Sequence, residues 1–171
     1  MGAKIYGPTV IGPHAKVGGE ISNSIFLGYS NKGHDGYLGN SIVGEWCNLG
    51  ADTNTSNLKN NYGEVQRWSY DTMSMVPSGL QFCGLIMGDH SKCAINTQFN
   101  TGTTVGVFAN IFTSKFPPKY IKSFSWLGEE QNELFKLEKA YEVAVRVMER
   151  RKIPLTDADK RLLEYLHNQA V

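Results

Sequence analysis

The fold is decided by residues 87–111, which read MGDHSKCAINTQFNTGTTVGVFANI. Five apolar residues stand there at every sixth position, and a small residue follows four places after each of the first four. The apolar set is Met87, Cys93, Phe99, Val105 and Ile111, and the small set is Ser91, Thr97, Thr103 and Ala109. The same register occurs earlier at Ile5, Ile11 and Val17 and at Val43 and Leu49. A fixed short period is typical of a solenoid.

The period also indicates how the chain is folded within each repeat. Six is even, so in extended chain every sixth side chain points to the same face. A continuous strand would also bury the second residue after each apolar one. Those positions hold mostly turn formers or polar residues: Gly7, Pro13, Gly19, Glu45, Ala51 and Asp89. Corners must therefore interrupt short strands. This mainly β pattern resembles the left-handed parallel β-helix, in which three hexapeptides make one triangular turn, with about five turns here.

Composition narrows the class of protein. The chain has 171 residues and a formal net charge of +1, which gives no reason to expect nucleic acid or an anionic membrane as a partner. No apolar run approaches the ~20 residues that a bilayer requires, and no signal peptide opens the chain. The cytoplasm is therefore the expected location. Cys47 and Cys93 fall on inward positions, where free cysteine acts as a small hydrophobe.

Two domains are expected. Residues 3–127 form the β-helix, interrupted at 56–85 by an irregular inserted loop whose polar and aromatic residues break the register. Residues 128–171 form a helical extension, because from Glu129 the apolar residues follow three-four spacing. Pro154 ends the first helix, and Thr156 with Asp159 has the spacing of a capping box for the second. The aromatic, proline-containing stretch 116–126 is expected to connect coil and helix and to cover the last coil edge.

The candidate for chemistry is the segment 30–40, SNKGHDGYLGN, which we interpret as a departure from the hexapeptide order. It places His34 among glycines. The unperturbed pKa of histidine lies near 6.5, close to operating pH, and glycines let backbone and substrate approach closely. His14 and His90 in repeat corners and His167 in the tail are interpreted as solvated surface.

The run 34–58 resembles the acetyltransferase domain of the bifunctional bacterial enzymes that make UDP-N-acetylglucosamine. The similar residues are HxxYLGN at 34–40, GxxxNLGA at 44–51, Thr53 and Asn57, and they match without a gap. These enzymes join glucosamine-1-phosphate N-acetyltransferase to UDP-N-acetylglucosamine diphosphorylase. The chain looks closest to the variant found in Bacteroidetes-type bacteria, for which the resemblance extends over the coil, residues 124–126 and both tail helices.

The resemblance implies an acetyl-CoA-dependent N-acetyltransferase that acts on the 2-amino group of glucosamine 1-phosphate without requiring a metal. His34 matches the general base, and Glu20, fourteen residues earlier, matches the carboxylate that orients it. The backbone N–H of Ala51 matches the donor to the thioester oxygen. The resemblance further implies sugar contacts from Tyr37, Asn48 and Asn57, and coenzyme contacts from Ala51, Ala94, Ile95 and Thr113. Lys115 is a separate candidate for contact with the nucleotide phosphates of the coenzyme.

Three positions depart from the family pattern and concern the acceptor. Ser22 stands where the family commonly has a phosphate-binding lysine, Asp52 replaces a glycine, and Leu58 replaces a tyrosine. A phosphate site needs positive charge but no one particular residue. The cations that could supply it are Lys4, Lys32, Lys59 and Arg67. Another amino sugar as acceptor stays open.

Partners and alternatives follow from the same resemblance. A homotrimer with an active site between subunits is implied. The family enzymes carry a nucleotidyltransferase domain ahead of the coil, so this chain is expected to be the carboxy-terminal part of a longer protein. One alternative is a non-catalytic coil that trimerises or regulates such a domain. A zinc site like that of the hexapeptide-fold carbonic anhydrases is disfavoured, because His14, His34 and His90 lack the required close spacing.

Overall fold

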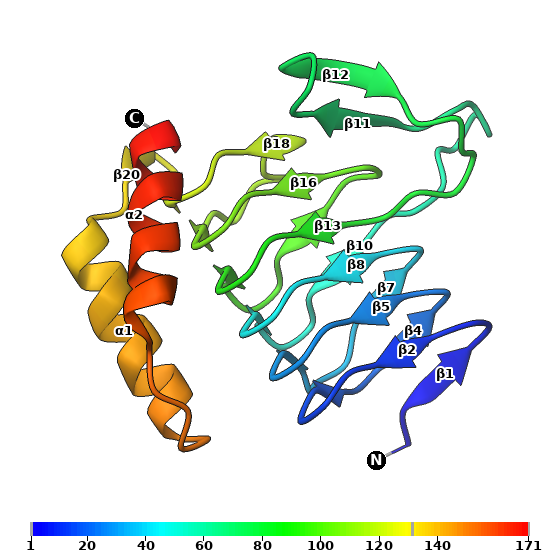
Figure 1. Cartoon of the computed structure of the whole chain (residues 1–171). Helices are drawn as coiled ribbons and strands as arrows, with labels where there is room; N and C mark the ends of the chain where they lie inside the picture. The colour runs from blue at the N-terminus through cyan, green and yellow to red at the C-terminus, as the bar shows by residue number, and fades with distance from the viewer. Residues whose placement is uncertain (1, 131, 171) are drawn as a thin grey trace.

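The computed structural model describes residues 2–130 and 132–170. Its main body is a parallel β-helix whose short strands stack into three faces (Figure 1). Face A contains β1 (Lys4–Tyr6), β4 (Glu20–Ser22) and β7 (Tyr37–Gly39). It continues with β10 (Asn54–Thr55) and β15 (Gln98–Phe99), because Asn54 and Thr55 accept hydrogen bonds from the backbone of β7.

Faces B and C are longer. Face B runs through β2 (Val10–Ile11), β5 (Ile25–Phe26), β8 (Ile42–Val43), β13 (Ile86–Met87), β16 (Thr104–Val105) and β18 (Tyr120–Ile121). Face C runs through β3 (Lys16–Val17), β6 (Asn31–Lys32), β9 (Asn48–Leu49), β14 (Lys92–Cys93), β17 (Asn110–Ile111) and β19 (Ser125–Leu127). Face B is a 6-stranded parallel sheet, so the solenoid has more turns than the about five expected. On face C an antiparallel strand, β20 (Asn132–Leu134), extends the sheet to 7 strands.

The core confirms the hexapeptide register. The large residues of the 87–111 repeat are at most 6% exposed, and the small residues that follow them are at most 1% exposed. In register terms, Lys32 occupies the inward position between Phe26 and Leu38, each six residues away. The segment 30–40 therefore keeps the hexapeptide order, and our interpretation of it as a departure was wrong. What is unusual is the residue type, since a lysine occupies a position that is apolar in other repeats.

The insertion at 56–85 is more regular than expected. It contains an antiparallel hairpin of β11 (Gln66–Ser69) and β12 (Ser74–Pro77), and Leu58 forms a β-bridge with Phe82 at its base. The Trp68 ring stacks on Tyr120 of β18 with centroids 3.9 Å apart, which ties the hairpin to face B. The stretch 116–126 is part of the solenoid, because it contains β18 and most of β19.

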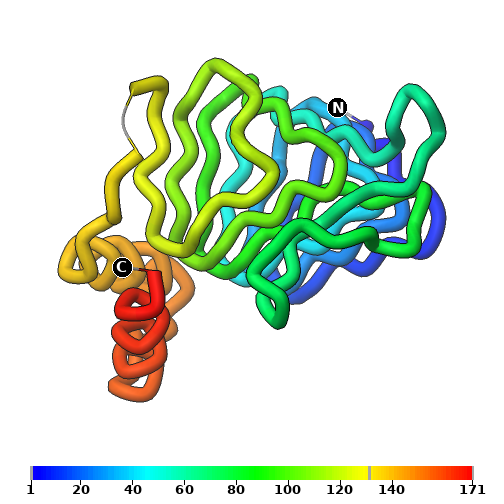
Figure 2. Tube along the Cα trace, turned by 90° about the horizontal axis from the view of Figure 1, so that it is seen from above, coloured from blue at the N-terminus to red at the C-terminus, as the bar shows by residue number. Residues whose placement is uncertain are grey.

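Two helices form the expected hairpin, α1 (Leu137–Glu149) and α2 (Asp157–Ala170). The helical region begins later than the sequence indicated, because Leu134 lies in β20. The capping box is confirmed: the Asp159 backbone N–H donates to Thr156 Oγ1 at 3.2 Å, and the Thr156 N–H donates to Asp159 Oδ2 at 2.8 Å. Figure 2 shows the coils stacked one beside another and the two helices lying together against one edge of the stack.

The helices pack on a column of stacked rings at the corner between faces B and C. Its members are His14, Tyr29, Trp46, His90, Phe108 and Phe124. All six adopt positive φ, between 56° and 63°, since each occupies the same tight corner of successive coils. Ala140, Ala144 and Leu163 of the helices join Trp46, Phe108 and Phe124 in one buried cluster. The helical hairpin therefore covers this corner, whereas His34 lies at the corner between faces C and A.

Candidate functional site

A groove of about 410 Å³ brings three of the expected site residues together. His34, Asn48 and Ala51 line it, along with Gly33, Gly50 and Ile95. His34 comes from the corner between β6 and β7, and Ala51 comes from the same corner one coil later. The imidazole of His34 is exposed, so it is accessible to a ligand in the groove.

Glycine makes the His34 corner possible. Gly36 has φ +111°, and a Cβ built on it would lie 2.2 Å from the carbonyl oxygen of Thr53 in the next coil. Gly33, on the other side of His34, has no atom within 4 Å of such a Cβ. Close approach between coils thus requires glycine at 36, whereas Gly33 leaves open space beside the histidine.

The backbone at Ala51 has the properties of an available donor. Its carbonyl accepts a hydrogen bond from the Asn96 N–H at 2.8 Å, while its own N–H donates to no atom of residues 2–130 or 132–170. The preceding Gly50 packs against the next coil so closely that a Cβ there would lie 2.4 Å from Ala94 C and from Ile95 N. The close packing of Gly50 therefore fixes the turn at 50–51, and the N–H of Ala51 remains unpaired within the described residues.

A second cavity, of about 260 Å³, lies beside the first and is lined by Lys4, Glu20, Asp35 and Tyr37. Glu20 and Tyr37 are register partners on adjacent strands of face A. Across the described residues, no hydrogen bond joins Glu20 to His34. The Tyr37 hydroxyl accepts a hydrogen bond from Asn57 Nδ2 at 2.9 Å, so two expected sugar-contacting residues are in direct contact.

The structure corrects the assignment of Lys32 as a substrate-binding cation. Its side chain is 0% exposed, and its ammonium donates to backbone carbonyls inside the coil. It is therefore unavailable to a sugar phosphate at the surface. Lys59 lines another cavity with Ser56 and Asn100, and its Nζ donates to the Glu64 carbonyl at 2.5 Å. Neither lysine lines the groove of His34.

The expected coenzyme residues continue along the corner of Ala51. The strands β9, β14 and β17 are successive neighbours on face C, and Ala51, Ala94 and Thr113 follow their carboxyl ends. The Ala94 N–H donates to the Ile111 carbonyl at 2.8 Å, which fixes this order. Lys115 is exposed, and its backbone N–H donates to Thr113 Oγ1 at 3.1 Å.

The three departures from the family pattern have different structural contexts. Asp52 has φ +57°, a conformation that favours glycine and that aspartate tolerates better than most residues. Asn54 Nδ2 donates to the Asp52 carbonyl at 3.0 Å, which supports the turn. Ser22 lies on face A in β4, and Leu58 lies in the β-bridge at the base of the insertion.

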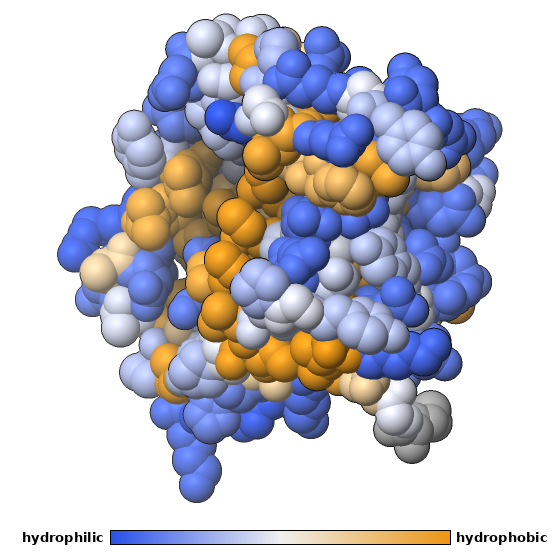
Figure 3. Space-filling model, turned by 90° about the vertical axis from the view of Figure 1, so that its right-hand side faces the viewer, coloured by the Kyte–Doolittle hydropathy of each residue, from blue (hydrophilic) through white to orange (hydrophobic). Residues whose placement is uncertain are grey.

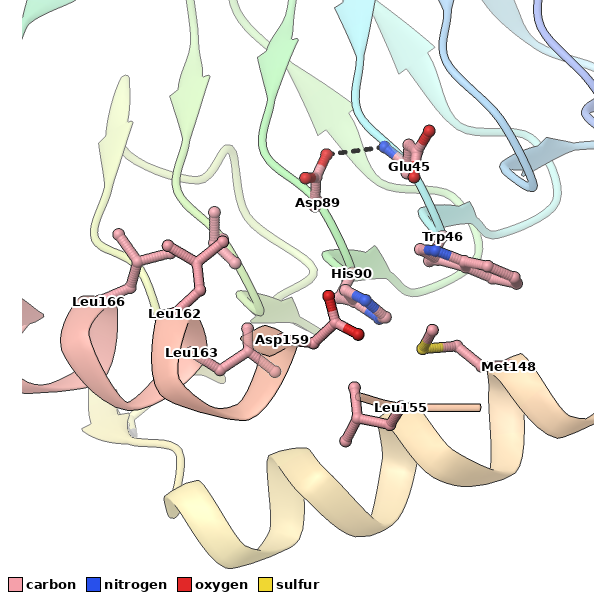
Figure 4. A pocket seen from close by; sticks show the side chains of 11 residues that line it. Glu45, Trp46, Asp89, His90, Met148, Leu155, Asp159, Leu162, Leu163 and Leu166 are labelled. Atoms are coloured by element: carbon pink, nitrogen blue, oxygen red, sulfur yellow. Dashed lines mark hydrogen bonds between the residues drawn. The ribbon is translucent and has the colours of Figure 1, made fainter. Parts of the chain in front are cut away.

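A further cavity lies beneath the helices and is lined mainly by apolar residues, with Trp46, His90, Met148 and Asp159 around it (Figure 4). At about 130 Å³ it is the smallest of these cavities. His90 is only 8% exposed, so its interpretation as solvated surface was wrong. Burial, and secondarily the charge of Lys92, lower the pKa of His90 to about 3. A histidine that is so weakly basic is unsuited to general-base catalysis at neutral pH.

Two residues of the His34 groove were missed by sequence reasoning. Asn31 and Lys16 both line it. Asn31 is the register partner of Asn48, and its Oδ1 is buried without a hydrogen-bond partner in the described chain. The sequence feature that could have identified Asn31 is its position three residues before His34. This feature predicts a place in the groove only if the segment is known to keep the hexapeptide register.

Two negative findings apply to the described residues. They contain no group of three or more His, Cys, Asp or Glu side chains arranged to hold a metal ion. Within the same ranges, neither helix combines the length and the apolar character that crossing a membrane requires.

The fold and the histidine-bearing corner define a parallel β-helix of hexapeptide repeats with a candidate transferase groove. No protein-family model matches the chain. Its sequence is similar to the bifunctional protein GlmU of Methanocaldococcus jannaschii, with 30% identity over 117 residues, which is 68% of this chain and 28% of that protein. The GlmU of Methanococcus aeolicus is 32% identical over 87 residues, or 51% of this chain and 20% of that protein.

A third relative is the bifunctional sugar-1-phosphate nucleotidylyltransferase/acetyltransferase of Sulfurisphaera tokodaii. It is 28% identical over 106 residues, which is 61% of this chain and 26% of that protein. The chain is therefore a homologue of the GlmU bifunctional proteins. It spans only 20% to 28% of the length of these curated relatives.

Proposed function

We propose that the chain transfers an acetyl group from acetyl-CoA to the amino group of an amino-sugar phosphate, with glucosamine 1-phosphate as the acceptor. One observation carries the proposal: His34, Asn48 and Ala51 line the same groove. One cavity is thus bordered by a histidine, which can accept a proton, and by the unpaired backbone N–H of Ala51. These are the two groups that acyl transfer to an amine requires. The names of the relatives support the same reaction class.

In the proposed reaction, a ring nitrogen of His34 accepts the proton that the acceptor amine loses as it attacks the thioester carbon. A new N–C bond forms, and the C–S bond breaks to release CoA. The Ala51 N–H donates to the thioester oxygen, where negative charge develops in the tetrahedral intermediate. Such a donor can contribute roughly 3 kcal/mol to the transition state. The coenzyme extends along the corner past Ala94 and Thr113 toward Lys115.

The acceptor sugar is proposed to bind near Tyr37, Asn48 and Asn57. Lys4 is the proposed phosphate-binding cation, because it lines the cavity that also contains Glu20 and Tyr37. The Glu20 carboxylate is proposed to orient His34 when substrate binds. Glu20→Gln is expected to lower kcat roughly tenfold and to change the pH dependence of kcat, since an adjacent carboxylate raises the basicity of a histidine. An unchanged pH profile would remove Glu20 from the mechanism.

The test is release of CoA from acetyl-CoA by the purified protein, measured with glucosamine 1-phosphate and a panel of other amino sugars. His34→Ala should lower kcat by roughly 10² or more. His14→Ala is the matched control, because His14 is also exposed but lies at the corner between faces B and C. Full activity in His34→Ala contradicts the assignment of the base. No CoA release with any acceptor would favour the non-catalytic scaffold.

We also propose a homotrimer in which β-helices pack side by side, joined in the longer protein to a nucleotidyltransferase domain. Figure 3, which views the molecule from the side opposite the helices, shows apolar residues gathered in a band with polar borders. On face B, Val10, Ile25 and Ile42 are register neighbours and are 39% to 56% exposed. Ile25→Glu should dissociate the trimer in sedimentation. A wild-type monomer at micromolar concentration would contradict the assembly.

A further inference from the structure

Face C carries a charged residue in its otherwise apolar inner column. Lys32 pairs with Val17 on one side, and Leu49 is its neighbour on the other. Later members of the column are Cys93 and Ile111. Lysine is almost never fully buried unless its charge has partners, yet Lys32 is 0% exposed. Throughout the described chain, no ion pair involves this ammonium.

The partners of the ammonium are backbone carbonyls of the corner that carries His34. Lys32 Nζ lies 3.1 Å from the carbonyl oxygen of His34, 3.1 Å from that of Asp35 and 2.9 Å from that of Gly36. A fourth carbonyl, from Gly18 in the preceding coil, lies at 3.4 Å. An ammonium has three donors and no acceptor, so one group can satisfy three consecutive carbonyls that point into the core.

This contact also reaches the strand of Glu20. The Gly36 carbonyl that accepts from Lys32 accepts a second hydrogen bond, from the Glu20 N–H at 3.1 Å. The ammonium therefore joins the His34 corner to β4 from the inside of the coil. Burial lowers the pKa of Lys32, and the nearby carboxylates of Asp35 and Asp52 act in the opposite direction.

We infer that Lys32 is a positioning residue, whose buried ammonium holds the corner 33–36 so that His34 faces the groove of Asn48 and Ala51. The inference rests on the proposed function, since it assigns Lys32 a role through the proposed base. Without the ammonium, the carbonyls of His34 and Asp35 would face an apolar column with no partner among the described residues, and that of Gly36 would keep only the Glu20 N–H. Such groups would reorient toward water, and the backbone at His34 would move with them.

The test compares Lys32→Met, which keeps length and removes charge, with Lys92→Met. Lys92 is a matched control because it is a second poorly exposed lysine of face C whose Nζ donates to a carbonyl, that of His90 at 2.7 Å. For the folded fraction, Lys32→Met should lower kcat by roughly 10- to 100-fold, with the KM for acetyl-CoA changed less than twofold. Lys92→Met should leave both within twofold.

Hydrogen exchange gives a readout that does not depend on activity. The Glu20 amide bonds to Gly36 O, and the Tyr37 amide bonds to Asn54 Oδ1 at 2.8 Å. Lys32→Met should speed the exchange of both amides at least tenfold relative to Lys92→Met. Equal exchange in the two variants, or an unchanged kcat in Lys32→Met, would overturn the inference.

A wild-type measurement covers the case in which Lys32→Met does not fold. In ¹⁵N-lysine NMR the Lys32 ammonium protons should give a slowly exchanging signal, and fast exchange with water would also overturn the inference. If the wild type releases no CoA, the proposed function fails. The amide and ammonium measurements then decide separately whether Lys32 holds the corner.

Discussion

Replacing Gly36 by alanine should strongly destabilise the coil around His34. The added methyl group would lie 2.2 Å from Thr53 O, 2.9 Å from Thr53 C and 3.1 Å from Thr53 N, all of them backbone atoms of the next coil. Relief of that overlap requires the two coils to separate, and overpacking of this kind costs about 1–3 kcal/mol. Gly36 also has φ +111°, at which a side chain adds about 1–3 kcal/mol of strain. The expected loss of stability is therefore about 2–6 kcal/mol.

Gly33→Ala is the matched control, because it lies on the other side of His34 and has open space around its added methyl group. Its φ is outside the left-handed region, so we expect a change within about 1 kcal/mol in either direction. Thermal unfolding followed by circular dichroism measures both variants. At roughly 2–4 °C per kcal/mol for a chain of this size, Gly36→Ala should lower the Tm by about 4–24 °C. Equal melting of the two variants would refute the argument from close coil packing.

Three other predictions concern the core, the helical hairpin and the cysteines. Phe99→Ala should cost about 3–5 kcal/mol in urea unfolding because Phe99 is 1% exposed, whereas Phe112→Ala, at a site 39% exposed, should cost clearly less. Asp159→Ala should cost about 1 kcal/mol through loss of the N-terminal cap. Hydrogen bonds from Thr156 lower the pKa of Asp159. The stability that the Asp159 carboxylate adds is therefore complete above its ordinary pKa and is lost as the pH falls through the lowered value. The difference in unfolding free energy between wild type and Asp159→Ala should shrink in acid, and a constant difference would contradict the cap. Burial raises the pKa of Cys47 to about 12, so its thiol should not react in the folded protein. Mass spectrometry should find Cys47 labelled by iodoacetamide in urea and unlabelled in the native protein. Labelling of the native protein would contradict the burial of Cys47.

Much of the fold could be predicted because hexapeptide spacing is a local property of the chain. Phe99 and Val105 are buried for the reason that the sequence indicates: each stands at an even interval on a strand between two corners. The capping box of Thr156 and Asp159 could likewise be predicted from the sequence, since the two residues lie three positions apart in one turn. The hairpin within 56–85 was missed, because its position depends on Trp68 stacking on a residue about fifty positions later.

The site was only partly predictable. His34, Asn48 and Ala51 were named from the sequence, and the structure brings them to one groove because stacked coils align the same corner. The ring column from His14 to Phe124 gave no periodic signal, since shortened corners and the insertion make its spacing uneven.

Lys32 shows the limit of sequence reasoning most clearly. Strand alternation makes position 32 a candidate for the inward face, because it lies two residues after Ser30 and six after Phe26. The segment 30–40 was nevertheless interpreted as a departure from the hexapeptide order, and the sequence does not reveal the carbonyls that make burial of a lysine tolerable. Only the folded corner, with three backbone oxygens around one ammonium, decides that the register holds. The sequence by itself determined the coil and its candidate base, whereas tertiary structure decided which charges face the groove and which lie inside, because burial of a charge depends on partners that only the fold assembles.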